Sequence, residues 1–83
     1  MEKELLAKQL LYRSTHRGCK ETDYLIGEYA KSEILKMEMV ELELFSEFID
    51  ENDWELYDWL LGKVVGPEKY DNFLTVIRKF HKI

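Results

Sequence analysis

Several residue types and patterns are scarce in this 83-residue chain, and each scarcity excludes a class of protein. A single cysteine, Cys19, excludes an internal disulfide framework and suits a reducing compartment. No apolar run approaches the ~18 residues that a membrane-spanning helix requires. The N-terminal stretch MEKELLAKQLL contains acids and lacks the pattern of a signal peptide. We therefore expect a cytoplasmic protein with no direct membrane insertion.

Motifs of catalysis and metal binding are also missing. The chain has no glycine-rich phosphate loop, no nucleophile elbow and no HExxH motif. His16 and Cys19 have a metal-like spacing, but zinc requires three or four ligands and only His81 remains as a further imidazole. Cys19, next to Lys20, has the setting of a reactive thiolate, although we predict that it faces the core. The sequence therefore predicts no catalytic residues and no metal site.

Composition predicts one globular domain over residues 1–83, because 46% of the residues are hydrophobic and 35% are charged. The net charge of −5 is unevenly distributed: residues 37–62 contain nine acids and no base. Such a segment argues against nucleic acid binding, which depends on clustered bases. The acids form either a solvated face, the interpretation that we favour, or a docking face for a basic partner.

Helical periodicity dominates the chain and predicts an all-α fold, a small antiparallel bundle of about five short helices. The apolar stripes begin with four leucines between residues 5 and 11 and continue at helical spacing in each later segment. Asp53 is a predicted N-cap and Pro67 a predicted first-turn residue. The predicted helices are 2–14, 19–31, 39–50, 53–61 and 67–80, with a turn around residues 32–38.

The corner between the first two predicted helices is the most informative stretch. Gly18 is predicted to adopt a positive φ or to cap the second helix, which places Glu21 at the third helical position. Arg17 is predicted to be an exposed charge with no local partner except Glu21 or Asp23. Farther along the chain, Trp54 is equally compatible with the core and with an interface.

The segment LLYRSTHRGCKETDYLIG resembles the signature of the succinate dehydrogenase assembly factors that promote covalent flavinylation. That family is built around an Arg-Gly-x-x-Glu motif between its first two helices, which here is Arg17, Gly18 and Glu21. Asp23 falls where the pattern continues. The later stretch ENDWELYDWLLG resembles the acidic, tryptophan-containing segment before the final helix, so that the resemblance covers residues 5–80. The chain departs from the family pattern at three positions. The family often has arginine where this chain has His16, a methionine-like residue where it has Cys19, and an apolar residue where it has Thr22.

The resemblance implies an assembly chaperone, not an enzyme. In such systems a histidine of the flavoprotein subunit attacks the 8α-carbon of FAD through a quinone-methide-like tautomer, and the small factor holds that partner in a reactive arrangement. The resemblance implies that the partner is the flavoprotein subunit of succinate dehydrogenase or fumarate reductase. It also implies that FAD acts in that partner and is not bound tightly by this chain, and that this chain is a monomer. The implied partner-binding residues are His16, Arg17, Gly18, Glu21 and Asp23.

Two other hypotheses remain open from the sequence. The first is a small helical adaptor, an antitoxin-like regulator or a cytoskeleton-binding regulator unrelated to flavin. The second, which the sequence favours least, is a redox or metal enzyme that uses Cys19 and His16.

Overall fold

The computed structural model of the chain describes residues 2–83. Within them lie five α-helices and two single 3₁₀ turns, and no strand. In chain order these are α1 (Glu2–Thr15), α2 (Lys20–Glu33), η1 (Ile34–Lys36), α3 (Met39–Ile49), α4 (Asp53–Leu60), η2 (Glu68–Tyr70) and α5 (Asp71–His81). The predicted all-α fold of about five short helices is therefore confirmed.

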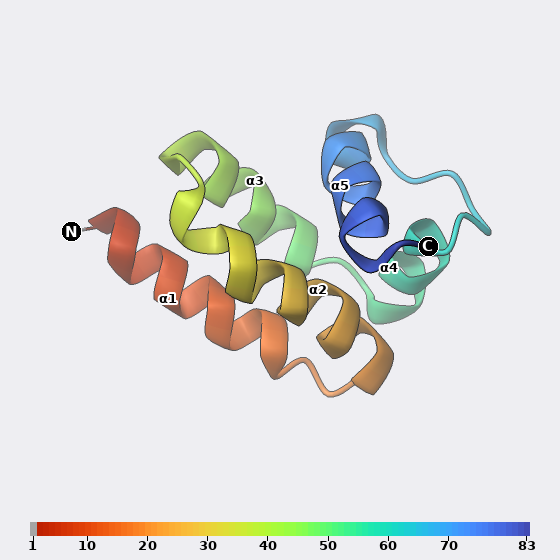
Figure 1. The fold of residues 1–83 in the computed structure, drawn as a ribbon, viewed down its shortest axis with the longest axis horizontal. Helices are drawn as coiled ribbons and strands as arrows, with labels where there is room; N and C mark the ends of the chain where they lie inside the picture. The colour runs from red at the N-terminus through yellow and green to blue at the C-terminus, as the bar shows by residue number, and fades with distance from the viewer. Residues whose placement is uncertain (1) are drawn as a thin grey trace.

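The helices are arranged in two neighbouring groups (Figure 1). The first group contains α1 and α2, which form an antiparallel hairpin, and α3, which packs against α1. In the second group, α4 and α5 pack against each other, and both also contact α2. The corner between α1 and α2 consequently lies near the beginning of α4.

One hydrophobic core joins all five helices. Rings of α3, η2 and α5 meet edge-on or tilted in it, with centroids 5.1–5.5 Å apart for the pairs Phe48–Tyr70, Phe48–Phe73 and Phe45–Phe73. Burying each such ring contributes about 1.5–3 kcal/mol. The predicted stripes of α2, α3 and α4 are largely buried, and that of α5 is buried except for Phe80.

Helix α1 buries the predicted stripe only in part: Leu10 is buried and Leu6 and Leu11 are partly buried against the core. Leu5 is 59% exposed, whereas the small residues Ala7 and Ser14 are buried together with Leu10. The reason is a close approach of α1 and α2: a Cβ added to Gly27 would lie 2.9 Å from Thr15 Cγ2. Small side chains are needed where two helices lie so near each other. The buried Ser14 hydroxyl is satisfied because it donates to the Leu10 carbonyl at 2.7 Å.

The predicted turn around residues 32–38 is confirmed, since η1 and two extended residues separate α2 from α3. The starts of α4 and α5 differ from the prediction. Asn52, not Asp53, caps α4, and its side-chain oxygen accepts the Trp54 N–H at 2.9 Å. Pro67 precedes η2, and α5 begins only at Asp71. Asp53 is thereby free to use its carboxylate elsewhere.

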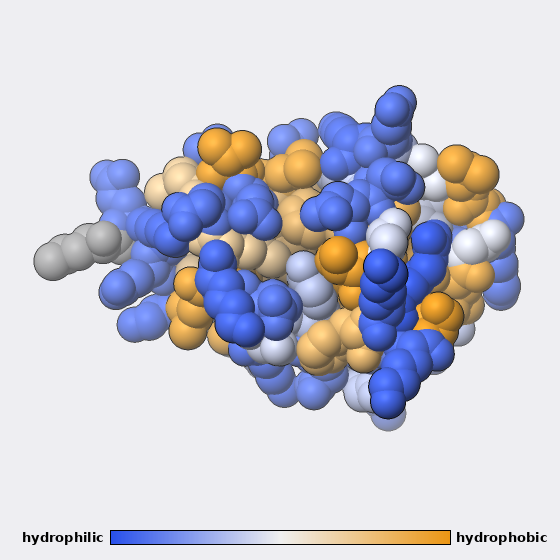
Figure 2. Space-filling view, turned by 45° about the horizontal axis from the view of Figure 1, so that its top comes forward, coloured by the Kyte–Doolittle hydropathy of each residue, from blue (hydrophilic) through white to orange (hydrophobic). Residues whose placement is uncertain are grey.

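Four of the nine acids in residues 37–62 pair with bases from the two ends of the chain. Lys3 pairs with Glu38 and Lys69 with Glu47, both at 3.4 Å, while Arg13 pairs with Asp50 and Arg17 with Asp53. Figure 2 shows hydrophilic side chains over much of one face, with hydrophobic ones reaching the surface in several separate places. Of the helices in residues 2–83, none has the length and apolar character that crossing a membrane requires.

Candidate functional site

The corner between α1 and α2 has the backbone that the glycine suggested. Gly18 has φ +100°, a conformation that L-residues rarely adopt, and a Cβ added there would meet no atom within 4 Å. The constraint at this position is therefore the backbone conformation and not a crowded neighbour. The N-cap of α2 is Cys19, one residue later than predicted, and Glu21 is consequently the second helical residue instead of the third.

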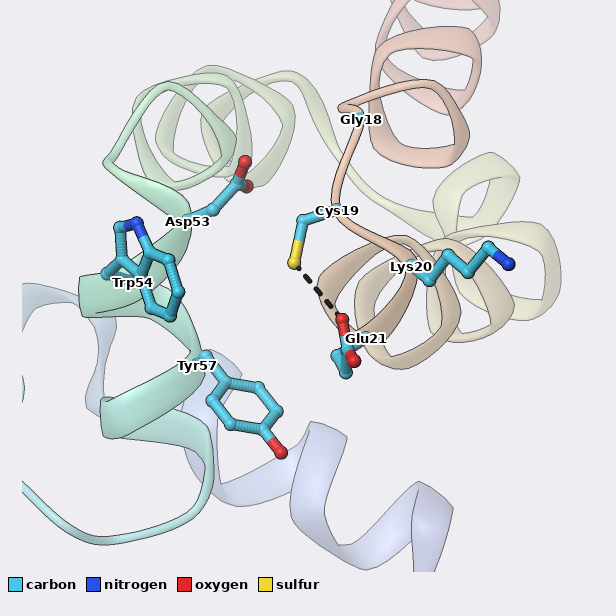
Figure 3. Close-up of a pocket in the computed structure, with 7 residues that line it drawn as sticks. All are labelled: Gly18, Cys19, Lys20, Glu21, Asp53, Trp54 and Tyr57. Atoms are coloured by element: carbon cyan, nitrogen blue, oxygen red, sulfur yellow. Dashed lines mark hydrogen bonds between the residues drawn. The ribbon is translucent and has the colours of Figure 1, made fainter.

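A cleft of about 470 Å³ lies between the corner and α4. One wall is the start of α2 with the two residues before it, and the other is the first turn of α4 with Tyr57 (Figure 3). The lining residues are Gly18, Cys19, Lys20, Glu21, Asp53, Trp54 and Tyr57. Two residues of the Arg-Gly-x-x-Glu motif thus face a segment more than thirty positions away in the sequence.

Glu21 and Cys19 lie next to each other on the first wall. Glu21 is exposed, and one carboxylate oxygen accepts a hydrogen bond from the Cys19 thiol at 3.4 Å (Figure 3). Cys19 is half-buried and points into the cleft, so the prediction that it faces the core is wrong. The reason is that a capping residue precedes the first helical turn and does not share the buried face of the helix.

Arg17 is not the exposed charge that the sequence predicted. Its side chain is only 11% exposed, and its guanidinium donates to three acceptors at the α3–α4 junction. Nε lies 2.7 Å from Asp53 Oδ1, Nη2 lies 2.8 Å from the Glu51 carbonyl, and Nη1 donates to the Ile49 carbonyl. The predicted local partner Asp23 is used by the backbone instead: its Oδ1 accepts the Arg17 N–H at 2.9 Å.

His16 and Asp23, two further residues of the predicted site, do not line the cleft. The His16 ring is exposed and stacks on Tyr12 with centroids 4.1 Å apart, and Nδ1 lies 2.9 Å from the Tyr12 carbonyl. It lines a separate, open depression together with Arg17, Arg13 and Asp50. Of the five predicted partner-binding residues, the structure brings only Gly18 and Glu21 together at the cleft. Partner contact by any of the five stays a prediction.

The sequence did not identify the second wall. Trp54 is 80% exposed, although it is a large aromatic residue in a small protein, and it stands beside Tyr57 on α4. The question of core or interface is thus settled against the core. The crowding of three aromatic residues in positions 54–59 was the available signal, but only Trp59 of the three is buried.

The junction behind the second wall is held from the other side by Tyr70. Its hydroxyl donates to Glu51 Oε2 at 2.7 Å. Burial, followed by this bond to the Glu51 carboxylate, raises the pKa of Tyr70 well above its ordinary value. Glu51 therefore contributes its carbonyl to Arg17 and its carboxylate to Tyr70.

The residues of the cleft are better suited to binding another molecule than to catalysing a reaction. The Cys19 thiol meets a carboxylate and no base, and Figure 3 shows the Lys20 ammonium directed away from it. His16 is bonded to its own helix on another surface. Among residues 2–83, no group of three or more His, Cys, Asp or Glu side chains is gathered as ligands of a metal ion. An exposed tryptophan next to charged groups is typical of a protein-binding surface.

Comparison with known proteins gives matches over most of the chain. A protein-family model, Sdh5, described as the flavinator of succinate dehydrogenase, matches residues 8–81. Succinate dehydrogenase assembly factor 2, mitochondrial, of Schizosaccharomyces pombe is 34% identical over 68 residues, 82% of this chain and 49% of that protein. The proteins of that name in Dictyostelium discoideum and Yarrowia lipolytica are 31% and 41% identical over 80 and 58 residues.

These alignments cover 96% and 70% of this chain and 57% and 40% of the two proteins. The chain therefore spans about half the length of the curated relatives it matches. No solved structure matches it.

Proposed function

The chain belongs to the Sdh5 family, the flavinators of succinate dehydrogenase, and on that premise we propose that it promotes covalent attachment of FAD to the flavoprotein subunit of that enzyme. It does so as an assembly chaperone. The relatives' names describe assembly factors of succinate dehydrogenase, which supports the same role here. The flavoprotein of a fumarate reductase is a second partner of the same chemistry.

The observation that carries this proposal is the cleft that brings Gly18 and Glu21 opposite Trp54. Tryptophan is enriched among the residues that dominate binding energy at interfaces. Glu21 adds an exposed carboxylate whose hydrogen-bond partner is a thiol, a weak donor, so it is available to a donor on the flavoprotein. The positive φ of Gly18 turns the chain sharply at the rim of the cleft.

The mechanism follows from where the reactive groups are. The histidine and the FAD both belong to the flavoprotein, and this chain binds that partner in the arrangement from which the two react. Orientation of this kind accelerates a reaction without a nucleophile or base from the chaperone. In this proposal the chain does not bind FAD tightly, does not insert into a membrane and does not bind nucleic acid. We propose that it acts as a monomer.

The compartment is a separate question. The relatives named above are mitochondrial by name, whereas the sequence prediction for this chain is the cytoplasm. The cytosol keeps a single thiol such as Cys19 reduced.

The test is a flavinylation assay with purified components. The flavoprotein subunit, prepared without covalent flavin, is incubated with FAD and with or without this chain, denatured, and examined for flavin fluorescence in the gel. We expect fluorescence to rise faster with the chain present. Trp54→Ala should reduce the rate, and Val40→Ala is the matched control because both side chains are 80% exposed. If the tryptophan contributes about 2 kcal/mol to the free energy of binding, its loss should weaken binding roughly 30-fold.

Equal labelling with and without the chain would refute the proposal. Retrieval of an unrelated protein from cell lysate, with no flavoprotein bound, would favour an adaptor of another pathway.

A further inference from the structure

Arg17 connects segments that are far apart in the sequence. Its three acceptors belong to residues 49, 51 and 53, which follow it by 32 to 36 positions. The Ile49 carbonyl is at the end of α3, where helical carbonyls lack partners within the helix and a positive charge is favoured. Asp53 is the first residue of α4. A single guanidinium therefore ends one helix and holds the beginning of the next.

The same carboxylate oxygen also binds α2. Thr22, which is fully buried in α2, places its hydroxyl 3.2 Å from both Asp53 Oδ1 and the Cys19 carbonyl, so that its one proton is shared between them. Asp53 thus receives one bond from the corner and one from the first turn of α2. These two bonds link the wall that carries Glu21 to the wall that carries Trp54.

Helix α4 is held by its three buried residues Leu56, Trp59 and Leu60 and by hydrogen bonds at both of its ends. It has only eight residues, too few for a helix to be stable without tertiary contacts. Its C-terminal end is held by Arg78, whose Nε donates to the Leu60 carbonyl at 3.0 Å. Its N-terminal end is held by Arg17 and Thr22. The position of Trp54, one residue after Asp53, is set by the bonds at this N-terminal end.

We propose that Arg17 is a positioning residue, which fixes the spacing between the Glu21 wall and the Trp54 wall and does not itself contact the partner. This inference rests on the proposed function for the identity of the partner. At 11% exposure, with its donors directed to three internal acceptors, the guanidinium has little to offer another protein. Lysine cannot replace it, because one ammonium does not reproduce a planar fork of donors.

The spacing of the walls can be measured in the isolated chain. Cys19 is the only cysteine and lines one wall, and Trp54 lines the other, so a bimane fluorophore attached to Cys19 is quenched by a nearby indole. Trp54→Phe defines the unquenched signal. We expect the quenching by Trp54 to fall in Arg17→Lys and Arg17→Gln. Arg13→Gln is the matched control. Arg13 lies at the same end of α1 and binds Ser46 and Asp50, but it does not bind Asp53.

Circular dichroism establishes first that each variant is folded. If the Arg17 variants do not fold, Asp53→Ala breaks the same link from the opposite side, since it removes the oxygen that accepts from Arg17 and Thr22. It should show the same loss of quenching.

Flavinylation is then measured with the unlabelled variants. We expect Arg17→Lys to slow it in parallel with the loss of quenching, on the order of 100-fold, because a misplacement of about 1 Å has that effect on an oriented reaction. Arg13→Gln should leave both signals unchanged.

Normal quenching with lost flavinylation would overturn the inference and make Arg17 a contact residue. Lost quenching with normal flavinylation would also overturn it, because the spacing would then not matter. If wild-type chain fails to promote flavinylation, the proposed function falls, and the quenching alone still decides whether Arg17 sets the spacing.

Discussion

Replacing Glu21 with glutamine separates the local role of this carboxylate from its role in binding. Glu21 is the second residue of α2 and is exposed, and within residues 2–83 its carboxylate accepts only the weak hydrogen bond from the Cys19 thiol. An acid in the first helical turn contributes about 0.3–1 kcal/mol through the helix dipole. For a domain of this size, about 1 kcal/mol corresponds to a change in Tm of roughly 4–8 °C. The variant should therefore remain folded, with Tm lowered by no more than that.

The expected effect on the partner is larger. A hydrogen bond to a charged group contributes about 1.5–3 kcal/mol when it is desolvated at an interface. Since 1.4 kcal/mol is a factor of ten, losing that bond should weaken binding of the flavoprotein by roughly 10- to 150-fold. Covalent FAD attachment should slow accordingly at a chain concentration below saturation.

The assay compares Glu21→Gln with Glu43→Gln at equal folded concentration. Glu43 is exposed on α3 and does not line the cleft, so its variant makes the same change of charge elsewhere. Thermal unfolding gives Tm, and flavin fluorescence of the denatured flavoprotein gives the rate. Equal labelling by Glu21→Gln and wild type, or an equal loss in Glu43→Gln, would refute the assignment of Glu21 to the binding surface.

Three further substitutions test separate parts of the account. Gly18→Arg should leave the helices formed, at a cost of about 1–3 kcal/mol for a side chain at φ +100°, but abolish flavoprotein binding in a pull-down; a variant that unfolds where wild type is stable would make the glycine structural. Gly27→Ala should lower the free energy of unfolding, measured by urea titration, by about 1–3 kcal/mol, because the added Cβ meets Thr15. It should retain flavoprotein binding. Unchanged stability would contradict the close approach of α1 and α2. Tyr70→Phe should reduce the loss of stability that occurs above about pH 10. The pKa of Tyr70 is raised in the folded chain, so the unfolded state loses the phenol proton at a lower pH than the folded state does. Wild-type stability therefore falls as the pH rises past the ordinary tyrosine pKa. Urea titrations at several alkaline pH values measure this, and a variant as alkali-sensitive as wild type would exclude Tyr70 as the group.

The sequence predicted most of the helices because their apolar residues repeat at helical spacing. Thr22, Leu25, Ile26 and Tyr29 are all buried on α2, as the stripe indicated. On α1 the same reasoning selected leucines and missed Ala7 and Ser14, because hydrophobicity ranks large side chains first. The close approach at Gly27 reverses that order, and it depends on two helices meeting, which no single helix reveals.

The site was predicted in part for a similar reason. Gly18 and Glu21 were identified from a local motif, and local signals were sufficient for a turn and a helix start. The partners of Arg17 follow it by more than thirty residues, whereas the local sequence offers only Glu21 or Asp23 and therefore predicts an exposed charge. Trp54 and Tyr57 join the site only through the packing of α4 beside the corner.

Photo-crosslinking from the cleft tests the central claim most directly. A benzoylphenylalanine residue is introduced at position 54, at the rim of the cleft, or at position 40 on α3, where the natural side chains are equally exposed at 80%. Each protein is mixed with the flavoprotein subunit of succinate dehydrogenase and irradiated. We predict a covalent product with the flavoprotein from position 54 and none from position 40. Crosslinking from position 40 alone, or from neither position while the chain still promotes flavinylation, would show that the partner binds elsewhere.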